Sequence, residues 1–239
     1  MILTREGHKM NLKKVRRLMN KYGLFCPIRK PNPYKKMMKA LEESTVAPNI
    51  LQRNFNKYGP RTVLLTDITY LYYADHRKCY LSSIKDAYTK ELLAWVLSPN
   101  MEEDFVLETV EILLINHKNE LKTDSLIHSD QGIHYKVIPF KDLLKDNNIT
   151  QSMSRKANCW DNAPQESFHG HMKDEIDISK CQTFEEVKEV IDTYMDYYNN
   201  ERPQWNLAKL TPSEYYEYSK NNIYPTITYN DKINDSKED

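Results

Sequence analysis

The sequence predicts an α/β fold in which one mixed sheet of five strands is flanked by helices and preceded by a short basic helical segment. Two observations along the chain carry this prediction. β-rich runs separated by polar turns follow one another between residues 63 and 97, and two further short runs then alternate with segments of helical periodicity. The composition agrees, because 40% apolar and 28% charged residues are typical of a globular domain with its own core.

Three strands in antiparallel succession are predicted at the start of this pattern. The first run begins at Val63 and remains β-rich through Ile68 to Tyr73, and we place Asp67 at a strand end. Runs 79–84 and 92–97 follow, each bounded by polar turn residues. Antiparallel neighbours are the simplest arrangement for strands joined by such short turns.

Two further strands and two helices are predicted over the next sixty residues. Apolar residues recur at helical spacing over 102–116, and a second helix is expected over about 138–145. Between them, residues 126–130 are expected to form a buried strand that ends on the acid Asp130, and a short strand near 150–154 follows the second helix. The alternation of helix and strand completes the α/β pattern.

The last predicted helices follow a polar segment. Asp161 and Asn162 offer capping side chains, and Pro164 suits the first turn of a helix that continues through Glu166 to Met172. We expect a final helix over 184–198. The tail from 230 on is rich in acidic and poor in apolar residues, so we expect it to be disordered.

Charge is divided unevenly along the chain, although the total of 34 basic and 34 acidic residues is neutral. Residues 1–62 hold 15 basic and 3 acidic residues, a net of +12, and the remainder holds 19 basic and 31 acidic residues, a net of −12. Such a basic arm usually binds a polyanion such as nucleic acid. The alternative is a solvated, charged helix without a partner.

Within this arm the sequence predicts a short basic amphipathic helix that ends near Gly23. Leu12, Val15, Leu18 and Met19 share one face, while Lys13, Lys14, Arg16 and Arg17 lie on the others. Three prolines then break regular structure, so 27 to about 60 is interpreted as an extended basic linker able to lie along phosphates.

Several classes of protein are disfavoured by composition. The apolar runs are too short to span a bilayer, and no signal peptide is recognisable at the amino end. The four cysteines are widely spaced and contain no C-x-x-C pair, which argues against a zinc ribbon or a disulfide scaffold. We therefore expect reduced cysteines and a cytoplasmic location.

Three acids occupy positions where catalytic sites form. Asp67 and Asp130 are placed at strand ends and Glu166 in the first turns of a helix, so neighbouring strands would bring the three carboxylates together. Such a cluster repels itself unless a divalent cation binds, and oxygen ligands favour Mg²⁺ or Mn²⁺ over zinc. Two such ions would support in-line attack on phosphorus. The alternative for each acid is a helix cap or a surface charge.

The surrounding motifs resemble those of a known family. "TDITY" around Asp67, "IHSDQGIHY" around Asp130 and "SMSRKANCWDNAPQESFHGHMKDE" around Glu166 resemble the three blocks of DDE transposases. The resemblance is to the insertion-sequence family named after insertion sequence three, and to its second-reading-frame protein. Asp130 and Glu166 are separated by 35 residues, as in that family. "HKMNLKKVRRLMNKYGL", "VAPNILQRNF" and "YYNNERPQWNLAKLTPSEY" extend the resemblance over about 8–216.

The resemblance implies an integrase core with an RNase H-like fold and a site for phosphoryl transfer. It makes Asp67, Asp130 and Glu166 the catalytic, metal-binding triad for Mg²⁺ or Mn²⁺, with two ions expected. Lys173, seven residues after Glu166, lies on the same helical face and is expected to contact DNA. Asn158 and Asn162 flank the helix start and are weaker DNA-binding candidates.

The implied activity is metal-dependent cleavage and strand transfer of DNA, in which a freed 3′ hydroxyl attacks the target. Its partners would be the element ends and the target DNA. We expect a homo-multimer, because two ends must be held together, and a helix-turn-helix protein from an upstream reading frame is a further candidate partner. The expected location is the bacterial cytoplasm, at the nucleoid.

The expected domains are a basic DNA-binding helix and linker over 1–60, the catalytic core over 61–216 and an acidic, disordered tail over 217–239. Relatives usually carry more sequence before the basic helix, so a truncated or domesticated DNA-binding remnant is the alternative function. A scaffolding protein would require the acids to be coincidental. A tyrosine recombinase is disfavoured because the Tyr-rich stretches lack an Arg/His cluster, and the tyrosines are interpreted mainly as packing residues.

Overall fold

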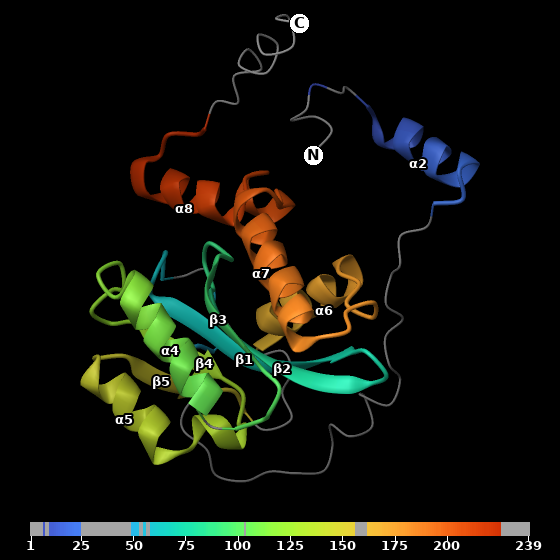
Figure 1. Ribbon diagram of the computed structural model, residues 1–239. Helices are drawn as coiled ribbons and strands as arrows, with labels where there is room; N and C mark the ends of the chain where they lie inside the picture. Colours follow the sequence, from blue (N-terminus) through green and yellow to red (C-terminus); the bar gives the residue numbers. More distant parts are fainter. Residues whose placement is uncertain are drawn as a thin grey trace, which may run out of the picture. The chain divides into compact units, whose positions relative to one another are not determined.

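The computed structural model describes Gly7, residues 10–24, 49–52, Phe55, 58–102, 104–155 and 162–225. The chain divides into two compact units, which are considered separately (Figure 1). Lys30–Asp196 forms the larger unit and contains the sheet. Met1–Arg29 and Tyr197–Asp239 form the smaller one.

Five strands build one mixed sheet in the order β3-β2-β1-β4-β5. Strands β1 (Val63–Tyr73), β2 (Arg77–Asp86) and β3 (Leu92–Ser98) pair antiparallel, as predicted from their short turns. Strands β4 (Leu126–Ser129) and β5 (Thr150–Met153) add in parallel beside β1. The parallel strands are joined through helices, because a parallel pair requires a crossover connection.

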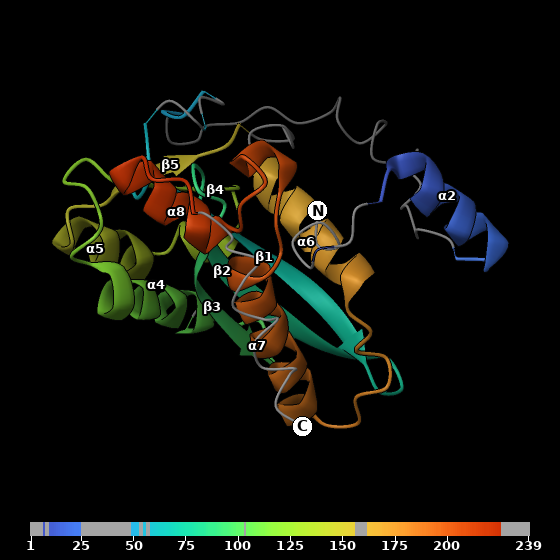
Figure 2. The same ribbon diagram turned by 90° about the horizontal axis from the view of Figure 1, so that it is seen from above.

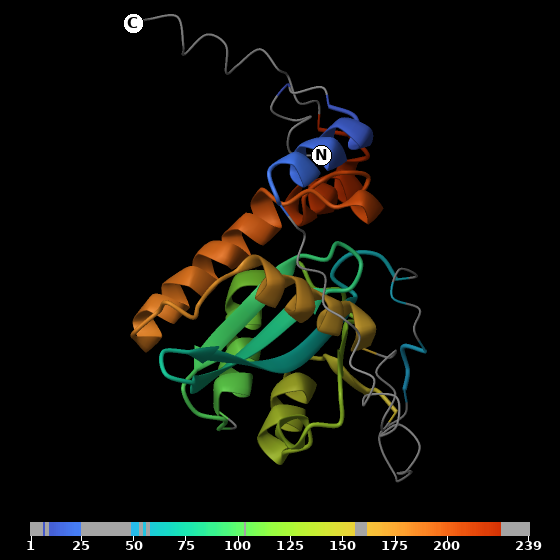
Figure 3. The ribbon, with the colours of Figure 1, turned by 90° about the vertical axis from the view of Figure 1, so that its right-hand side faces the viewer.

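Helices cover both faces of this sheet (Figures 2 and 3). α4 (Asp104–His117) and α5 (Ile138–Asp146) pack on one face, and α6 (Ala163–Glu175) packs against β1 on the other. Successive side chains of β2 point to opposite faces of the sheet. Ser82 accepts a hydrogen bond from Thr109 of α4, whereas the next residue, Ser83, accepts one from Gln165 of α6.

The main core lies between the sheet and the α4–α5 face. Leu64 and Ile127 from the two central strands contact a cluster that includes Val110 of α4 and Phe140 of α5. The other face is less apolar where α6 covers it, because Ser83, Lys85 and Asp67 alternate with those core residues along β1 and β2. The fold therefore places polar side chains on the face of the sheet that α6 covers.

Two sequence predictions need correction. Asp67 does not lie at a strand end: it is inside the 11-residue β1, because the alternating residues from Ile68 to Tyr73 continue the pairing with β2. The helix predicted over 184–198 is α7 (Phe184–Asn200), but it is not the last one. α8 (Pro212–Asn221) follows it and extends into the segment expected to be a disordered tail.

The smaller unit contains the predicted basic helix, α2 (Leu12–Lys21). Asn11 caps it by accepting a hydrogen bond from the Lys14 N–H at 2.8 Å. Lys13, Lys14, Arg16 and Arg17 are all exposed. Most of the predicted linker over 27–60 and the tail from 226 on lie outside the described residues.

Two of the four cysteines can be described. Cys79 and Cys181 are buried and carry free thiols, and burial raises the pKa of Cys79 to about 11. A thiol with so high a pKa is a poor nucleophile at neutral pH, because little of it is present as thiolate.

None of the helices in the described part of the chain combines the length and apolar character needed to cross a bilayer.

Candidate active site

Asp67 and Asp130 come from the two central, parallel strands of the sheet. Leu65 of β1 pairs with His128 of β4, and each aspartate lies two residues further along its chain. Because side chains alternate along a strand, both carboxylates belong to the face that α6 covers. Asp67 is 18% exposed, and Asp130 follows β4 directly in an exposed position.

The two carboxylates influence each other electrostatically. Although the Asp130 residue is exposed as a whole, desolvation of its carboxylate by the surrounding protein raises the pKa of Asp130, and the negative charge of Asp67 raises it further. The Gly132 N–H, Lys136 and His134 oppose this shift. A pair of carboxylates that repel each other and offer only oxygen donors suits a hard divalent cation, which would relieve the repulsion. The residues present therefore fit such an ion.

α6 carries Glu166 in its first turn, where the side chain is exposed. The start of this helix is attached to β1, because Asn162 Nδ2 donates to the Thr66 carbonyl at 3.2 Å. Three residues after Glu166, on the same side of the helix, His169 Nδ1 lies 3.5 Å from Asp67 Oδ2. The helix thus brings its first two turns to the strand that holds Asp67.

The three predicted carboxylates are not gathered equally. The negative charge of Asp67 acts on the carboxyl group of Asp130. Within the described residues, however, the structure contains no group of three or more His, Cys, Asp or Glu side chains arranged to hold one metal ion. Glu166, exposed in the first turn of α6, is therefore not part of a three-carboxylate cluster among the described residues.

Polar side chains buried beneath α6 connect it to β2. Gln165 Nε2 donates to Ser83 Oγ at 2.7 Å, and the same hydroxyl lies 3.0 Å from His169 Nε2. Burial lowers the pKa of His169, the contact with Asp67 raises it, and the nearby Lys85 and Lys173 charges lower it. These residues were not singled out from the sequence, since Ser83 and Gln165 are 82 positions apart and no local pattern joins them.

Lys85 is a further buried polar residue that was missed. Its ammonium donates to the Pro164 carbonyl at 2.5 Å and lies 5.1 Å from the centre of the Phe168 ring. Burial and the charge of Lys90 lower the pKa of Lys85 well below its ordinary value, while Asp67 opposes the shift. Lys85 therefore attaches the first turn of α6, which carries Glu166, to β2.

The predicted DNA-binding residues have different surroundings. Lys173 is half-buried on α6, donates to Thr69 Oγ1 at 2.5 Å and lies 4.8 Å from the centre of the Tyr70 ring. Asn162 is only 4% exposed and its side chain makes no capping hydrogen bond, so it positions the helix and leaves little surface for DNA. Asn158 and Asp161 lie outside the described residues.

Gly132 sets the environment of Asp130. Its N–H donates to Asp130 Oδ1 at 2.8 Å, and a Cβ at this position would lie 2.9 Å from the same oxygen. His128, in contrast, is a buried strand histidine with Nδ1 2.9 Å from Ser152 Oγ. The "SDQG" sequence after β4 was the available signal for the close turn at Gly132.

We expect Gly132→Ala to displace the Asp130 carboxylate. The added methyl group cannot remain 2.9 Å from an oxygen, so the Asp130 carboxylate must rotate away or the turn must shift, at a cost of up to about 1–3 kcal/mol in the free energy of unfolding. Urea unfolding followed by circular dichroism measures this destabilisation, and Mn²⁺ titration measures the effect at the site. A variant with unchanged stability and unchanged Mn²⁺ affinity would show that the close contact is unimportant.

Comparison with protein families identifies two overlapping matches. Residues 57–159 match a family described as "Integrase core domain", and residues 147–212 match a second family with the same description. Together they extend from just before β1 to the start of α8. Asp67 and Asp130 lie in the first match and Glu166 in the second.

Similar curated proteins are transposases of mobile elements. An uncharacterized transposase-like protein of Haemophilus influenzae is 38% identical over 222 residues, covering 91% of this chain and 98% of that protein. The putative transposase InsK for insertion sequence element IS150 of Escherichia coli K12 is 37% identical over 216 residues, covering 89% of this chain and 74% of that protein.

Solved structures share the fold at low sequence identity. The catalytic core domain of BIV integrase aligns with a TM-score of 0.50 and 17% identity, over 69% of this chain and 99% of that one. A chain of the simian T-cell lymphotropic virus intasome aligns with a TM-score of 0.55 and 11% identity, over 79% of this chain and 64% of that one. The predicted RNase H-like mixed sheet is confirmed by this likeness.

Proposed function

The chain belongs to the insertion-sequence transposases that carry an integrase core domain, and on that premise we propose that Asp67, Asp130 and Glu166 are its catalytic carboxylates. Members of this family are DDE-type polynucleotidyl transferases that act on DNA. The observation that supports the residue assignment is the register of β1 and β4, which gives Asp67 and Asp130 equivalent positions along two neighbouring strands.

Divalent metal dependence accompanies the integrase core, and we propose Mg²⁺ or Mn²⁺, with two ions, for this chain. Asp67 and Asp130 would supply oxygen ligands from the sheet, and Glu166 would supply a third carboxylate from α6 when substrate is bound. Bound cations would activate the attacking water or hydroxyl and stabilise the leaving oxygen of an in-line displacement at phosphorus. Burial is the larger cause of the raised pKa of Asp130, and the additional contribution from the charge of Asp67 supports the pairing of the two aspartates.

The protein's own groups would orient the reacting strand. Lys173, on the same helix as Glu166, would contact a phosphate, and its present partners Thr69 and Tyr70 belong to the strand that carries Asp67. Water or a 3′ hydroxyl would attack the phosphorus in line with the leaving oxygen. No covalent bond to the protein is required for cleavage or strand transfer.

The assignment is tested with a labelled duplex that carries the element's terminal repeat. The purified chain is incubated with this duplex in Mg²⁺ or Mn²⁺, and nicked and strand-transfer products are separated by size. We expect products with either metal and none after chelation. Equal product formation in the presence of excess chelator would exclude the proposed metal-dependent mechanism.

We propose that residues 1–60 form a DNA-binding segment in which α2 contacts the phosphate backbone. The support is the exposure of Lys13, Lys14, Arg16 and Arg17 on a capped helix of net positive charge. We further propose that the transposase works at the nucleoid as a homo-multimer, because two element ends must be held together. A helix-turn-helix protein from an upstream frame would contribute recognition of those ends.

Neutralising α2 is expected to weaken DNA binding at every sequence tested. Replacing Lys13, Lys14, Arg16 and Arg17 by Gln should lower the salt slope of log affinity by up to about 0.9 for each DNA phosphate that the variant no longer neutralises. Fluorescence anisotropy with a labelled duplex between 50 and 200 mM salt, approximately the range over which such binding weakens, provides the measurement. Lys141→Gln with Lys145→Gln, exposed on α5, is the control. An unchanged slope in the α2 variant would require another role for this helix.

A further inference from the structure

Three buried polar side chains form a connected series that ends at Asp67. Gln165 Nε2 donates to Ser83 Oγ at 2.7 Å, Ser83 Oγ lies 3.0 Å from His169 Nε2, and His169 Nδ1 lies 3.5 Å from Asp67 Oδ2. Gln165 and Ser83 are 0% exposed and His169 is 5% exposed. Water therefore has little access to compete for these contacts.

The register of the sheet sets this series at the level of the candidate site. Ser83 of β2 is the direct cross-strand partner of Asp67 of β1. His169 reaches both residues from α6, with one ring nitrogen toward each. The imidazole thus bridges two neighbouring strands at the position where the carboxylate emerges.

The hydrogen positions follow from the chemistry of the partners. A carboxylate only accepts hydrogen bonds, so the Nδ1 of His169 that faces Asp67 carries a hydrogen. Gln165 donates to Ser83 Oγ, which leaves the Ser83 hydroxyl hydrogen for Nε2 of the neutral ring. The donors then point in one direction, from Gln165 through Ser83 and His169 to Asp67, and a single tautomer is favoured.

Both oxygens of Asp67 are consequently restrained. Oδ1 accepts the N–H of Ile68 at 2.9 Å, and Oδ2 faces His169. A carboxylate oxygen has two lone pairs, so each retains capacity for a cation. A ligand held in place before the ion arrives binds it with less rearrangement than a freely rotating one.

We propose that His169, Ser83 and Gln165 are positioning residues that orient the Asp67 carboxylate for a divalent cation. This inference rests on the proposed function, in which Asp67 is a metal ligand. It adds a role for β2, which neighbours the strand of Asp67 but supplies none of the three proposed carboxylates. It also gives the helix that carries Glu166 a second task, since His169 lies one turn further along α6.

The test measures Mn²⁺ binding to the full chain by calorimetry, without DNA and without a turnover assay. His169→Phe should weaken Mn²⁺ binding by about tenfold, the low end for removal of a group that orients a metal ligand. Ser83→Ala should weaken it by about fivefold, as expected for loss of the buried hydrogen bond between the Ser83 hydroxyl and His169. His169→Gln retains an N–H donor and should recover part of the affinity.

Two matched controls separate positioning from general destabilisation. His171→Phe makes the same change two residues away on the exposed side of α6, and Ser82→Ala removes a buried hydroxyl that faces α4. Both should bind Mn²⁺ like the unmodified chain. Affinities of His169→Phe and Ser83→Ala that equal those of the controls would overturn the inference.

Asp67→Asn distinguishes failure of this inference from failure of the proposed function. Loss of Mn²⁺ binding in Asp67→Asn, together with control-like behaviour of His169→Phe and Ser83→Ala, would reject only the positioning role. Unchanged binding in Asp67→Asn would reject the metal-ligand assignment and the positioning role together. Weakened binding in all three variants supports both.

Discussion

Glu166→Gln is expected to abolish DNA cleavage while leaving the fold intact. The substitution removes one ionisable oxygen without changing the size of the side chain, and Glu166 is exposed in the first turn of α6, so little packing changes. A carboxylate that holds a catalytic cation cannot be replaced by an amide of the same shape, and the rate should fall on the order of 10³-fold or more.

The measurement is nicking of a labelled terminal-repeat duplex under single-turnover conditions, alongside thermal unfolding of each protein. Glu111→Gln provides the matched control, since it makes the same change on an exposed position of α4, across the sheet. The control should retain full activity. Equal nicking by Glu166→Gln and the unmodified chain would remove Glu166 from the catalytic group.

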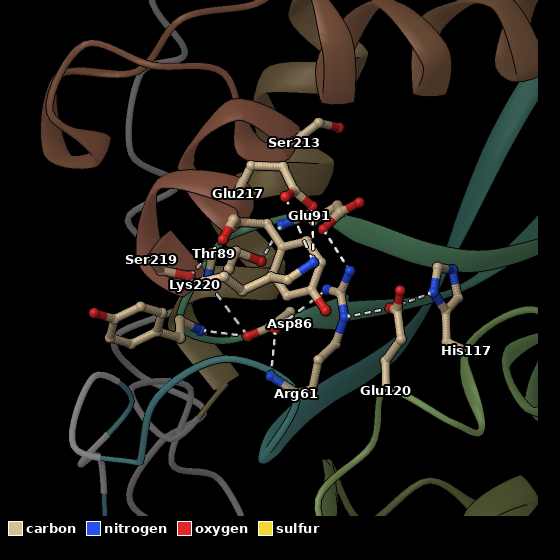
Figure 4. A network of polar contacts seen from close by, with 12 residues as sticks. Arg61, Asp86, Thr89, Glu91, His117, Glu120, Ser213, Glu217, Ser219 and Lys220 are labelled. Carbon is tan, nitrogen blue, oxygen red and sulfur yellow. Dashed lines mark hydrogen bonds and ion pairs between the residues drawn. The ribbon is translucent and has the colours of Figure 1, made fainter. Parts of the chain in front are cut away.

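Arg61→Ala is expected to cause the largest loss of stability among single substitutions considered for the sheet. The Arg61 side chain is 2% exposed and makes ion pairs with Asp86 at 3.3 Å, Glu91 at 2.8 Å and Glu120 at 3.0 Å (Figure 4). Burial alone would lower the pKa of Arg61, but the charges of Glu91 and Asp86 raise it above its ordinary value. The guanidinium therefore stays charged among carboxylates.

Truncation leaves those carboxylates without their cation. Asp86 is fully buried and also accepts the backbone N–H groups of Arg61, Tyr88 and Thr89, so it cannot move into water. Removing one partner of a buried ion pair typically costs about 3–5 kcal/mol, and we expect a decrease of that size in the free energy of unfolding. Arg61→Lys should recover only part of the lost free energy of unfolding, because an ammonium group lacks the planar guanidinium that reaches three acids.

Urea unfolding of Arg61→Ala, Arg61→Lys and Lys220→Ala checks this expectation. Lys220 forms an exposed ion pair with Glu217, and such pairs contribute little to stability. If Arg61→Ala unfolded at the same urea concentration as Lys220→Ala, the buried network would not stabilise the start of β1.

Local sequence patterns were sufficient for the order of the elements in the core. Alternation of β-rich runs with helical periodicity gives all five strands and the helices α4 to α7 within a few residues of their observed bounds. The β-rich run to Tyr73 was recognised, but Asp67 was wrongly placed at a strand end because a charged residue inside a strand resembles a terminus. α8 was missed, although Thr211 and Glu214 form a capping box and Pro212 occupies the first turn.

The candidate site was only partly accessible from sequence. Sequence patterns indicate acids at the ends of helices and strands one at a time. Only the resemblance to a known family assigns the three acids to one catalytic site. The side chains that surround Asp67 cannot be found in this way, since His169 is 86 residues from Ser83 and both resemble ordinary polar residues in their own segments. Their association depends on the strand register and on which side of α6 faces the sheet.

We propose that Asp67, Asp130 and Glu166 together hold divalent cations at one site. Crystals of the protein soaked in Mn²⁺, preferably with a duplex end bound, would locate the ions by anomalous scattering. We expect an anomalous peak within coordination distance of both Asp67 and Asp130, with Glu166 joining it in the DNA-bound form. A peak elsewhere, with none between the two aspartates, would contradict it.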